Sequence, residues 1–416
     1  MKKSLILFLL LTTINIKPQT YPPAVEVWSE PVRIDSLAER FKGEDSPFLT
    51  NDMMNLYLFK SSVICKSYKI DTLWSLPIPL NNNVNNGNPI RNPSISVDKK
   101  RLYYSRWGGY GNWDLWYSKW DTLLNDWGPS INLGSNVNST STEWYAYELS
   151  EDTLHCINNL WASLGLCIYV RNAITNEWQI IDSSNYNHPF GAGNLRGLSV
   201  TGDRRKAYFS RYITLLSDSL QSELFVTYWD SANNRWGNVF ELNINSKAFK
   251  PDPNNNFYWI GGWDENPWIS SNGKVMYFMS NRDAAREDTI TIPDIYVSYQ
   301  LIDENGNPVS LEELPDLKLI LNDFILFQNY PNPFNSITNI RFYLPQNDDV
   351  SLTIYDILGK EVFRPISNQS MIAGWHEYLL NLDRSDKDSS ALSSGVYLYT
   401  LKTSGGNRSK KMILLR

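Results

Sequence analysis

Two carboxylates, Asp45 and Glu265, are the residues of this sequence whose placement best fits a known kind of reaction. Each stands seven positions before a polar residue of a predicted turn, and three other residues share that spacing. The full set is Asp45, Arg91, Tyr145, Arg196 and Glu265. Because a glycosidase needs two carboxyl groups a few ångströms apart across the sugar, Asp45 and Glu265 could do acid–base work on a glycan. The alternative is that both carboxylates are solvated or neutralise Arg91 and Arg196. We take Arg91, Tyr145 and Arg196 as candidates for ligand binding.

An aromatic loop forms a second candidate site. Trp107, Tyr110 and Trp113 stand in the Gly-rich stretch 106–113. Exposed aromatic side chains there could stack on sugar rings or anchor a protein partner. The alternative is that all three pack between neighbouring structural units, as large aromatic side chains usually do.

Other kinds of chemistry have little support in the sequence. The three histidines, His155, His188 and His376, are dispersed, and no Gly-x-Ser-x-Gly segment occurs, so neither a catalytic triad nor a zinc site is predicted. The Asn-rich stretches 81–88 and 252–256 lack the ligand spacing of an EF-hand. We expect no metal and no cofactor. A formal net charge of −6 also argues against nucleic acid as a partner, because phosphate binding needs a basic surplus.

The candidate residues lie within a sequence repeat. A short apolar run is followed by a second run and then by a Trp that opens a third. The first run occurs five times, at Leu56-Tyr57, Leu102-Tyr103, Leu154-His155, Ala207-Tyr208 and Met276-Tyr277. The Trp follows at Trp74, Trp127, Trp178 and Trp236. Turns rich in Asp, Asn and Gly separate the runs, so each unit is predicted to form four short strands.

Repeated four-stranded units predict a β-propeller, because radial stacking buries faces that a single sheet would expose. We therefore predict an all-β fold with five blades over about 24–300. No Trp-led strand follows Val297, whereas 28–34 is similar to 127–133, so the N-terminal strand is expected to complete the last blade. The alternative is that 308–314 completes it. The repeat aspartates, Asp52, Asp98, Asp152 and Asp203, are expected to hydrogen-bond their own backbone in turns.

The repeat resembles the WD40-like (PD40) repeat of TolB-type propellers. Matching residues of the second unit are Pro93, Ser96, Asp98, Leu102, Tyr103, Arg106, Gly108, Gly109, Asp114 and Trp127, and the fifth unit matches at Pro267, Ser270, Gly273, Tyr277, Arg282 and Asp294. The third unit departs from the pattern, with a turn shortened around Glu151 and Asp152. The resemblance implies the fold and says nothing of activity.

Residues 324–416 follow a different pattern, after a predicted linker at 301–323. Short strands separated by tight turns predict a small Ig-like β-sandwich. The segment resembles the type A C-terminal sorting domain of the type IX secretion system. The motif residues that carry the resemblance include Asn329, Tyr330, Pro331, Asn332, Pro333, Phe334, Gly359, Gly395 and Tyr397.

This resemblance implies export, with the type IX translocon and sorting machinery as partners. The protein is then expected to be secreted or held on the outer-membrane surface of a Gram-negative bacterium. Residues 1–20 independently predict a signal peptide, because Lys2 and Lys3 precede the apolar run 5–11. No internal run reaches the roughly 20 apolar residues of a membrane helix, so no transmembrane segment is expected in the mature chain. Cys156 and Cys167 could form a disulfide across a hairpin or stay free.

The leading hypothesis is a secreted or surface-displayed propeller that binds a protein or glycan ligand and has no catalytic residue. The alternative is an extracytoplasmic glycan hydrolase that uses the carboxylates Asp45 and Glu265, which would lie in the central channel of the propeller. A purely structural role in a surface layer or in adhesion is a third hypothesis.

Overall fold

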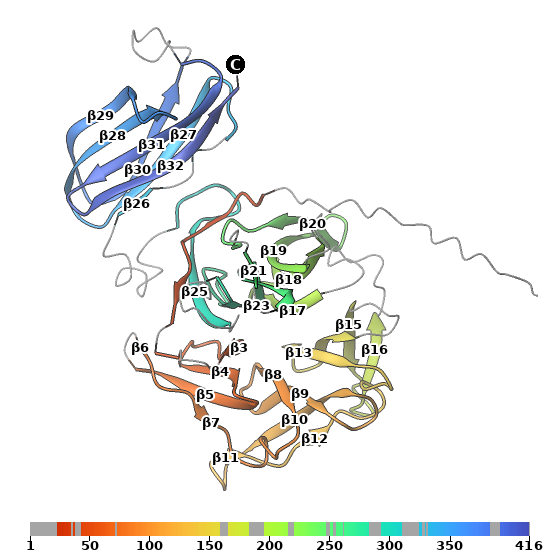
Figure 1. Cartoon of the computed structure of the whole chain (residues 1–416). Helices are drawn as coiled ribbons and strands as arrows, with labels where there is room; N and C mark the ends of the chain where they lie inside the picture. Colours follow the sequence, from red (N-terminus) through yellow and green to blue (C-terminus); the bar gives the residue numbers. More distant parts are fainter. Residues whose placement is uncertain are drawn as a thin grey trace, which may run out of the picture. The chain divides into compact units, whose positions relative to one another are not determined.

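The computed structural model describes residues 23–34, 36–37, 43–70, 73–158, 165–182, 195–214, 220–246, 250–252, 255–260, 262–282, 293–309, 324–326, 329, 332–382 and 392–415. The predicted signal peptide lies outside these ranges. The chain divides into two compact units, Met1–Asn307 and Pro308–Arg416. All regular elements of the described residues are β-strands (Figure 1). None of these residues forms a helix long and apolar enough to cross a membrane.

Five antiparallel sheets form the blades of the first unit, and a two-stranded sheet accompanies them. Blade one holds β3 (Glu44–Leu49), β4 (Asn55–Lys60) and β5 (Val63–Ile70), with β6 (Leu73–Trp74) and β7 (Ile78–Pro79) paired to β5. Blade two holds β8 (Ile90–Ile95), β9 (Arg101–Trp107) and β10 (Trp113–Asp121), with β11 (Asp126–Trp127) and β12 (Ile131–Asn132) paired to β10. Blade three is β13 (Glu143–Ser150), β14 (Thr153–Asn158), β15 (Gly165–Arg171) and β16 (Trp178–Asp182).

Blade four is β17 (Leu195–Val200), β18 (Lys206–Thr214), β19 (Leu220–Asp230) and β20 (Arg235–Glu241), and a hairpin of β21 (Lys250–Asp252) and β22 (Asn255–Ile260) follows it. Blade five holds β23 (Asp264–Ile269), β24 (Val275–Ser280) and β25 (Asp294–Ile302). The first strands β3, β8, β13, β17 and β23 surround a common centre (Figure 1). Each of them contacts the next, and β23 contacts β3, so the ring is closed. The predicted five-bladed propeller is confirmed.

The N-terminal segment forms the outer edge of blade five. β1 (Val27–Trp28) and β2 (Val32–Arg33) both pair with β25, as β11 and β12 pair with β10 in blade two. Trp28 is 1% exposed and Trp127 is 2% exposed, so the two side chains occupy equivalent buried positions. Most of the alternative closing segment, 308–314, lies outside the described residues.

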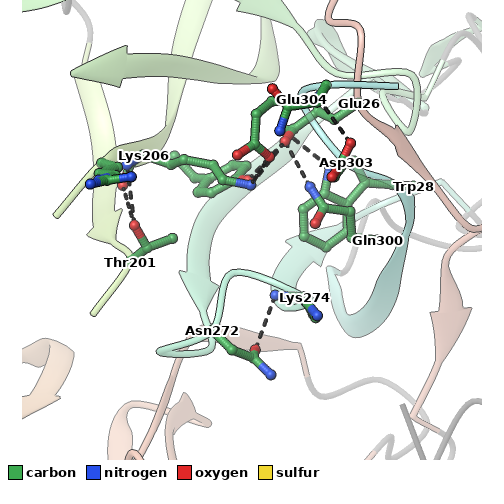
Figure 2. Close-up of polar contacts among 12 residues, drawn as sticks. Glu26, Trp28, Thr201, Lys206, Asn272, Lys274, Gln300, Asp303 and Glu304 are labelled. Atoms are coloured by element: carbon green, nitrogen blue, oxygen red, sulfur yellow. Dashed lines mark hydrogen bonds and ion pairs between the residues drawn. The ribbon is translucent and has the colours of Figure 1, made fainter. Parts of the chain in front are cut away.

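A buried polar cluster fixes this N-terminal edge to blades four and five. Lys206 on β18 reaches between Glu26 and Glu304, with Nζ–oxygen distances of 3.7 Å and 2.6 Å (Figure 2). Glu26 also accepts hydrogen bonds from Trp28 Nε1 at 3.3 Å and Gln300 Nε2 at 2.8 Å. Because Glu26 is fully buried, these partners compensate for the loss of water around its carboxyl group.

The hydrophobic core lies between adjacent blades rather than at the centre of the ring. The cluster between blades one and two includes Tyr57, Ile64, Leu102 and Trp127. The other described clusters likewise join blades two and three, three and four, and four and five. Since burying one large apolar side chain contributes about 1.5–3 kcal/mol, these interfaces hold the ring together and leave the channel residues free to serve a ligand.

The turn between the first two strands repeats in detail, as expected for three of the repeat aspartates. Asp52, Asp98 and Asp203 each accept a hydrogen bond from a backbone N–H two residues further along. Each also accepts one from the Ser or Thr two residues before it. These carboxylates are therefore engaged in turn structure.

Three asparagines form a second repeated feature, which we did not predict. Asn85, Asn138 and Asn245 each hydrogen-bond both the N–H and the C=O of one residue on the third strand of a blade. The side-chain amide thus replaces a neighbouring strand. Asn85 lies in the Asn-rich stretch that we considered for calcium, and its amide is occupied by the backbone of Ile64.

The second unit is a sandwich of two sheets, which confirms the predicted Ig-like fold. One sheet is β26 (Ile325–Leu326), β27 (Ile337–Leu344) and β30 (Gly374–Asn381). The other is β29 (Glu361–Met371), β28 (Asp348–Asp356), β31 (Gly395–Thr403) and β32 (Gly406–Leu414). One core cluster draws apolar residues from both sheets, among them Ile340, Leu352 and Tyr399.

The sorting motif residues hold the edges of this sandwich. The Asn332 carboxamide accepts a hydrogen bond from Ile413 N at 2.8 Å, and Phe334 is buried. Asn329 N donates to Tyr399 Oη at 2.7 Å, and Tyr397 Oη donates to Ser393 O at 2.8 Å.

Two glycines of the motif mark turns and strand ends in the sandwich. Gly359 has φ +79° in the turn between β28 and β29, and Gly395 begins β31. Pro333 lies between Asn332 and Phe334 in the opening segment, and its side chain is exposed. Tyr330 and Pro331 lie outside the described residues.

Candidate ligand-binding site at one end of the propeller channel

The first strand of every blade has a bulge at the same position. In each bulge one residue adopts a left-handed backbone conformation, with φ between +52° and +59°. These residues are Ser46, Asn92, Tyr145, Gly197 and Asn266. A bulge locally turns the strand and redirects its side chains. The residues immediately before the five bulges are Asp45, Arg91, Trp144, Arg196 and Glu265.

Blade three corrects one residue of the aligned set. Trp144 pairs with Ile157 as Arg91 pairs with Ser105, so Trp144 is equivalent to Arg91 and Tyr145 is the bulge residue itself. The cause is the position of Asp152, which stands eight residues after Trp144, whereas Asp98 stands seven residues after Arg91. Counting seven positions back from the turn aspartate therefore ends one residue too late in this blade.

Blades one, four and five bring a charged cluster together. Glu265 is 6% exposed, and burial raises its pKa to about 7. The positive charge of Arg196 opposes this rise in pKa, whereas the negative charge of Asp45 adds to it. Asp45 accepts hydrogen bonds from Asn266 Nδ2 at 2.6 Å and Ser46 Oγ at 3.0 Å. The oxygen Glu265 Oε1 is buried and has no hydrogen-bond partner among the described residues. A polar atom in that position is available to a ligand.

Two tyrosines complete this cluster. Tyr145 lies close enough to Arg196 and Glu265 to interact with both charges, and burial raises its pKa. The Arg196 guanidinium lies 4.7 Å from the ring centroid of Tyr212. Of these residues, the sequence did not single out Tyr212. Its only signal was its place near the end of the second strand of blade four, where blade two carries Trp107.

Blades two and three form the aromatic part of the same mouth. Trp113 stacks on Trp144 with ring centroids 4.7 Å apart and meets Trp107 edge to face at 5.7 Å. Trp107 is 47% exposed and Tyr110 is 53% exposed. The packing alternative therefore describes Trp113, whereas Trp107 and Tyr110 present large apolar surface to solvent.

The loop that carries these aromatic side chains is fixed by its own hydrogen bonds. Asp114 is fully buried and accepts hydrogen bonds from Tyr110 N at 2.7 Å and Gly111 N at 3.0 Å. Asn112 N also donates to Ser141 O, which precedes blade three. Such bonds preorganise a binding surface, because little conformational freedom is left to lose when a ligand binds.

The five bulge residues line a small space inside the ring. Ser46, Asn92, Tyr145, Gly197 and Asn266 all border a cavity of about 40 Å³. A separate cavity of about 270 Å³, at the end where the first strands finish, is lined by residues such as Phe48, Tyr147 and Trp268.

The described residues hold no group of three or more His, Cys, Asp or Glu side chains placed to bind a metal ion. Cys65, Cys156 and Cys167 are buried, and Cys156 and Cys167 form no disulfide with each other. Cys156 and Cys167 face each other directly in the pairing of β14 with β15.

These features define a β-propeller joined to a β-sandwich, and comparison with known families identifies the second unit. Residues 328–415 match the secretion system C-terminal sorting domain, so this part of the chain belongs to that family. The resemblance to the type IX sorting domain is thereby confirmed. The protein is secreted or displayed on the outer-membrane surface of a Gram-negative bacterium, and its sorting domain interacts with the secretion machinery.

Solved structures with a similar arrangement share little sequence with this chain. The Bacillus subtilis arabinanase Arb43A is 13% identical, with a TM-score of 0.41, over 64% of this chain and 97% of that one. A putative TolB from Agrobacterium tumefaciens is 12% identical, with a TM-score of 0.36, over 86% of this chain and 98% of that one. PorZ of the Porphyromonas gingivalis type IX secretion system is 11% identical, with a TM-score of 0.35, over 89% of this chain and 51% of that one. No curated protein matches the chain.

Proposed function

We propose that this secreted propeller binds a glycan at the channel mouth formed by Asp45, Arg91, Trp144, Arg196 and Glu265. One observation carries the proposal: a buried, hydrogen-bonding polar cluster lies beside exposed, preorganised aromatic side chains at the same end of the ring. Sugars have apolar ring faces and many hydroxyl groups, so they suit a site that offers both surfaces.

The polar half of the mouth supplies orientation. Glu265 Oε1 can accept a sugar hydroxyl hydrogen bond, and Arg196 beside it can donate. The aromatic half supplies contact area through Trp107 and Tyr110. The ligand is expected to lie across the opening of the channel, with room for a chain to extend outward.

A binding screen with the purified full-length protein tests the proposal. We expect at least one polysaccharide from a panel of arabinans, xylans, mannans, glucans and uronate-containing polymers to retard the protein in affinity electrophoresis. Trp107→Ala should weaken that binding about tenfold, because loss of one aromatic stacking partner costs about 1 kcal/mol or more.

The matched control is Trp229→Ala, which removes a tryptophan from β19 on the outer part of blade four, where it is 37% exposed. Equal loss of binding in both variants would assign the effect to general damage. Absence of binding to every polymer would refute the proposal.

Hydrolysis of the bound glycan is a second candidate function, favoured by one specific observation. The pKa of Glu265 is raised to about 7 by burial, as a general acid requires near neutral pH. Asp45 lies on the neighbouring first strand and is bonded to Asn266, the residue next to Glu265. The pair could then act as acid and base across a glycosidic bond.

Turnover of chromogenic glycosides and polysaccharides decides between binding alone and hydrolysis. If Glu265 is the acid, activity falls as pH rises through about 7, because the carboxyl group then loses the proton that it must donate. Glu265→Gln and Asp45→Asn should each abolish turnover while binding persists. No turnover on any substrate of the panel would leave the binding function alone.

A further inference from the structure

Arg91 differs from the other arginine of the mouth in having no acidic partner. The positive charge of Arg196 interacts with the negative charge of Glu265, although the described side chains of the two residues form no direct ion pair. The side chain of Arg91 is exposed and forms no ion pair with the described residues. Its guanidinium instead lies 5.2 Å from the ring of Phe59 and 6.0 Å from the ring of Trp113.

The aromatic rings hold this arginine in place without neutralising it. Contacts between a guanidinium and aromatic faces stabilise the cation at low cost in hydration. All five N–H donors of the guanidinium therefore remain available to a ligand. A planar guanidinium presents them in a fork that matches the two oxygens of a carboxylate.

Trp113 connects this cation to the exposed aromatic surface. The same indole that Arg91 approaches also meets Trp107 edge to face, with ring centroids 5.7 Å apart. Arg91 and Trp107 therefore both lie against the indole of Trp113, which places the cation near the exposed aromatic surface. Asp114 fixes the loop between Trp107 and Trp113 through backbone hydrogen bonds, so this spacing is built into the fold.

We propose that the mouth selects a carboxylated glycan, with a uronate ring stacked on Trp107 and its carboxylate bound by Arg91. This inference rests on the proposed glycan-binding function and specifies its ligand class. The whole chain has a formal net charge of −6, so general electrostatic attraction does not account for binding of a polyanion. Binding of a polyanion would require a local cationic site such as Arg91.

The experiment compares polymers that differ only in their carboxyl groups. The probes are polygalacturonate and alginate, each beside its methyl-esterified form, with neutral arabinan, xylan and mannan included. We expect the full-length protein to bind at least one acidic polymer. It should bind the ester of that polymer at least tenfold more weakly, or not at all. Arg91→Gln should weaken binding of the acidic polymer about tenfold to 100-fold, as loss of a charge-assisted hydrogen-bonded pair implies, and leave binding of the ester unchanged.

Arg235→Gln is the matched control, because Arg235 is an exposed arginine on the outer strand β20. Equal weakening by Arg91→Gln and Arg235→Gln would overturn the inference, as would equal binding of acid and ester. Binding of a neutral polymer alone, sensitive to Trp107→Ala, would overturn the carboxylate inference and preserve the glycan-binding function. Binding of none of the polymers would overturn both.

Discussion

Replacing Glu26 with Gln should change how the stability of the propeller depends on pH. Glu26 is fully buried where the N-terminal strand joins blades four and five, with Lys206, Trp28 and Gln300 around its carboxyl group (Figure 2). Burial raises its pKa from 4.5 to about 7, although the positive charge of Lys206 opposes that shift. Gln has nearly the same shape and no proton to exchange.

The sign and size of the effect follow from the two pKa values. Between about pH 4.5 and pH 7 the folded protein holds the proton of Glu26, whereas the unfolded chain has released it. The free energy of unfolding therefore falls as pH rises through this interval. A difference of about 2.5 pKa units corresponds to roughly 3 kcal/mol between pH 4.5 and pH 8, and this dependence is absent in Glu26→Gln.

The variant should also lose hydrogen bonds, because the Gln amide is a donor where the carboxyl group accepted from Gln300 or Trp28. At pH 5 we expect Glu26→Gln to be less stable than the original protein by about 1–3 kcal/mol. At pH 8 that deficit should disappear or reverse, since only the original protein then carries a buried charge.

Urea unfolding followed by tryptophan fluorescence measures this quantity. All 16 tryptophans except Trp375 lie in the propeller unit, so the signal reports on the ring. The free energy of unfolding should fall by about 3 kcal/mol per molar urea. The difference between the urea midpoints of the two proteins should therefore change by about 1 M from pH 5 to pH 8. Glu177→Gln, an exposed position in blade three, is the control. An identical change of midpoint with pH in Glu26→Gln and the original protein would refute the reasoning.

Three further perturbations test other parts of the fold. Asn138→Ala leaves the buried N–H of Leu115 without a partner, whereas its C=O keeps the hydrogen bond from Leu133 N, so the free energy of unfolding in urea should fall by about 1–3 kcal/mol. Gly197 has φ +59°, and Gly197→Ala adds a Cβ atom 2.7 Å from the Cα of Asn266. Thermal unfolding should show that the free energy of unfolding falls by about 1–3 kcal/mol. Deleting 324–416 removes the sorting domain, so cell fractionation should find the propeller in the periplasm; unchanged surface delivery would contradict its role.

The fold could be predicted from the sequence because its repeats are local. Four of the five blades use the same turn, with a Ser or Thr and an Asp or Asn two residues apart, and the side chains of both bond the turn backbone. The Trp-led outer strand was recognisable at 28–34 because Trp28 occupies the position that Trp127 holds in blade two. Such features need only a few consecutive residues.

The site was predicted less completely because it depends on register and long-range contacts. Because Asp152 lies one position later in its turn than Asp98 does, counting back from it gives Tyr145 instead of the equivalent residue Trp144. The stacking of Trp113 on Trp144 joins residues of different blades, and no local pattern reports it. The asparagines that hydrogen-bond the third strand of a blade did leave a signal. Asn85, Asn138 and Asn245 each follow Val or Ile.

The five positions before the bulges are also the places where this fold permits specificity. Their backbone geometry repeats around the ring, with a left-handed residue following each one. Their side chains do not repeat, since they are Asp, Arg, Trp, Arg and Glu in order. The turn positions at the other end of the first strand repeat both backbone and side-chain chemistry, because the turn itself needs those side chains. Where the fold fixes the backbone and leaves the side chain unconstrained, the side chains are free to match a ligand, and in this propeller they place cations and carboxylates beside an aromatic surface.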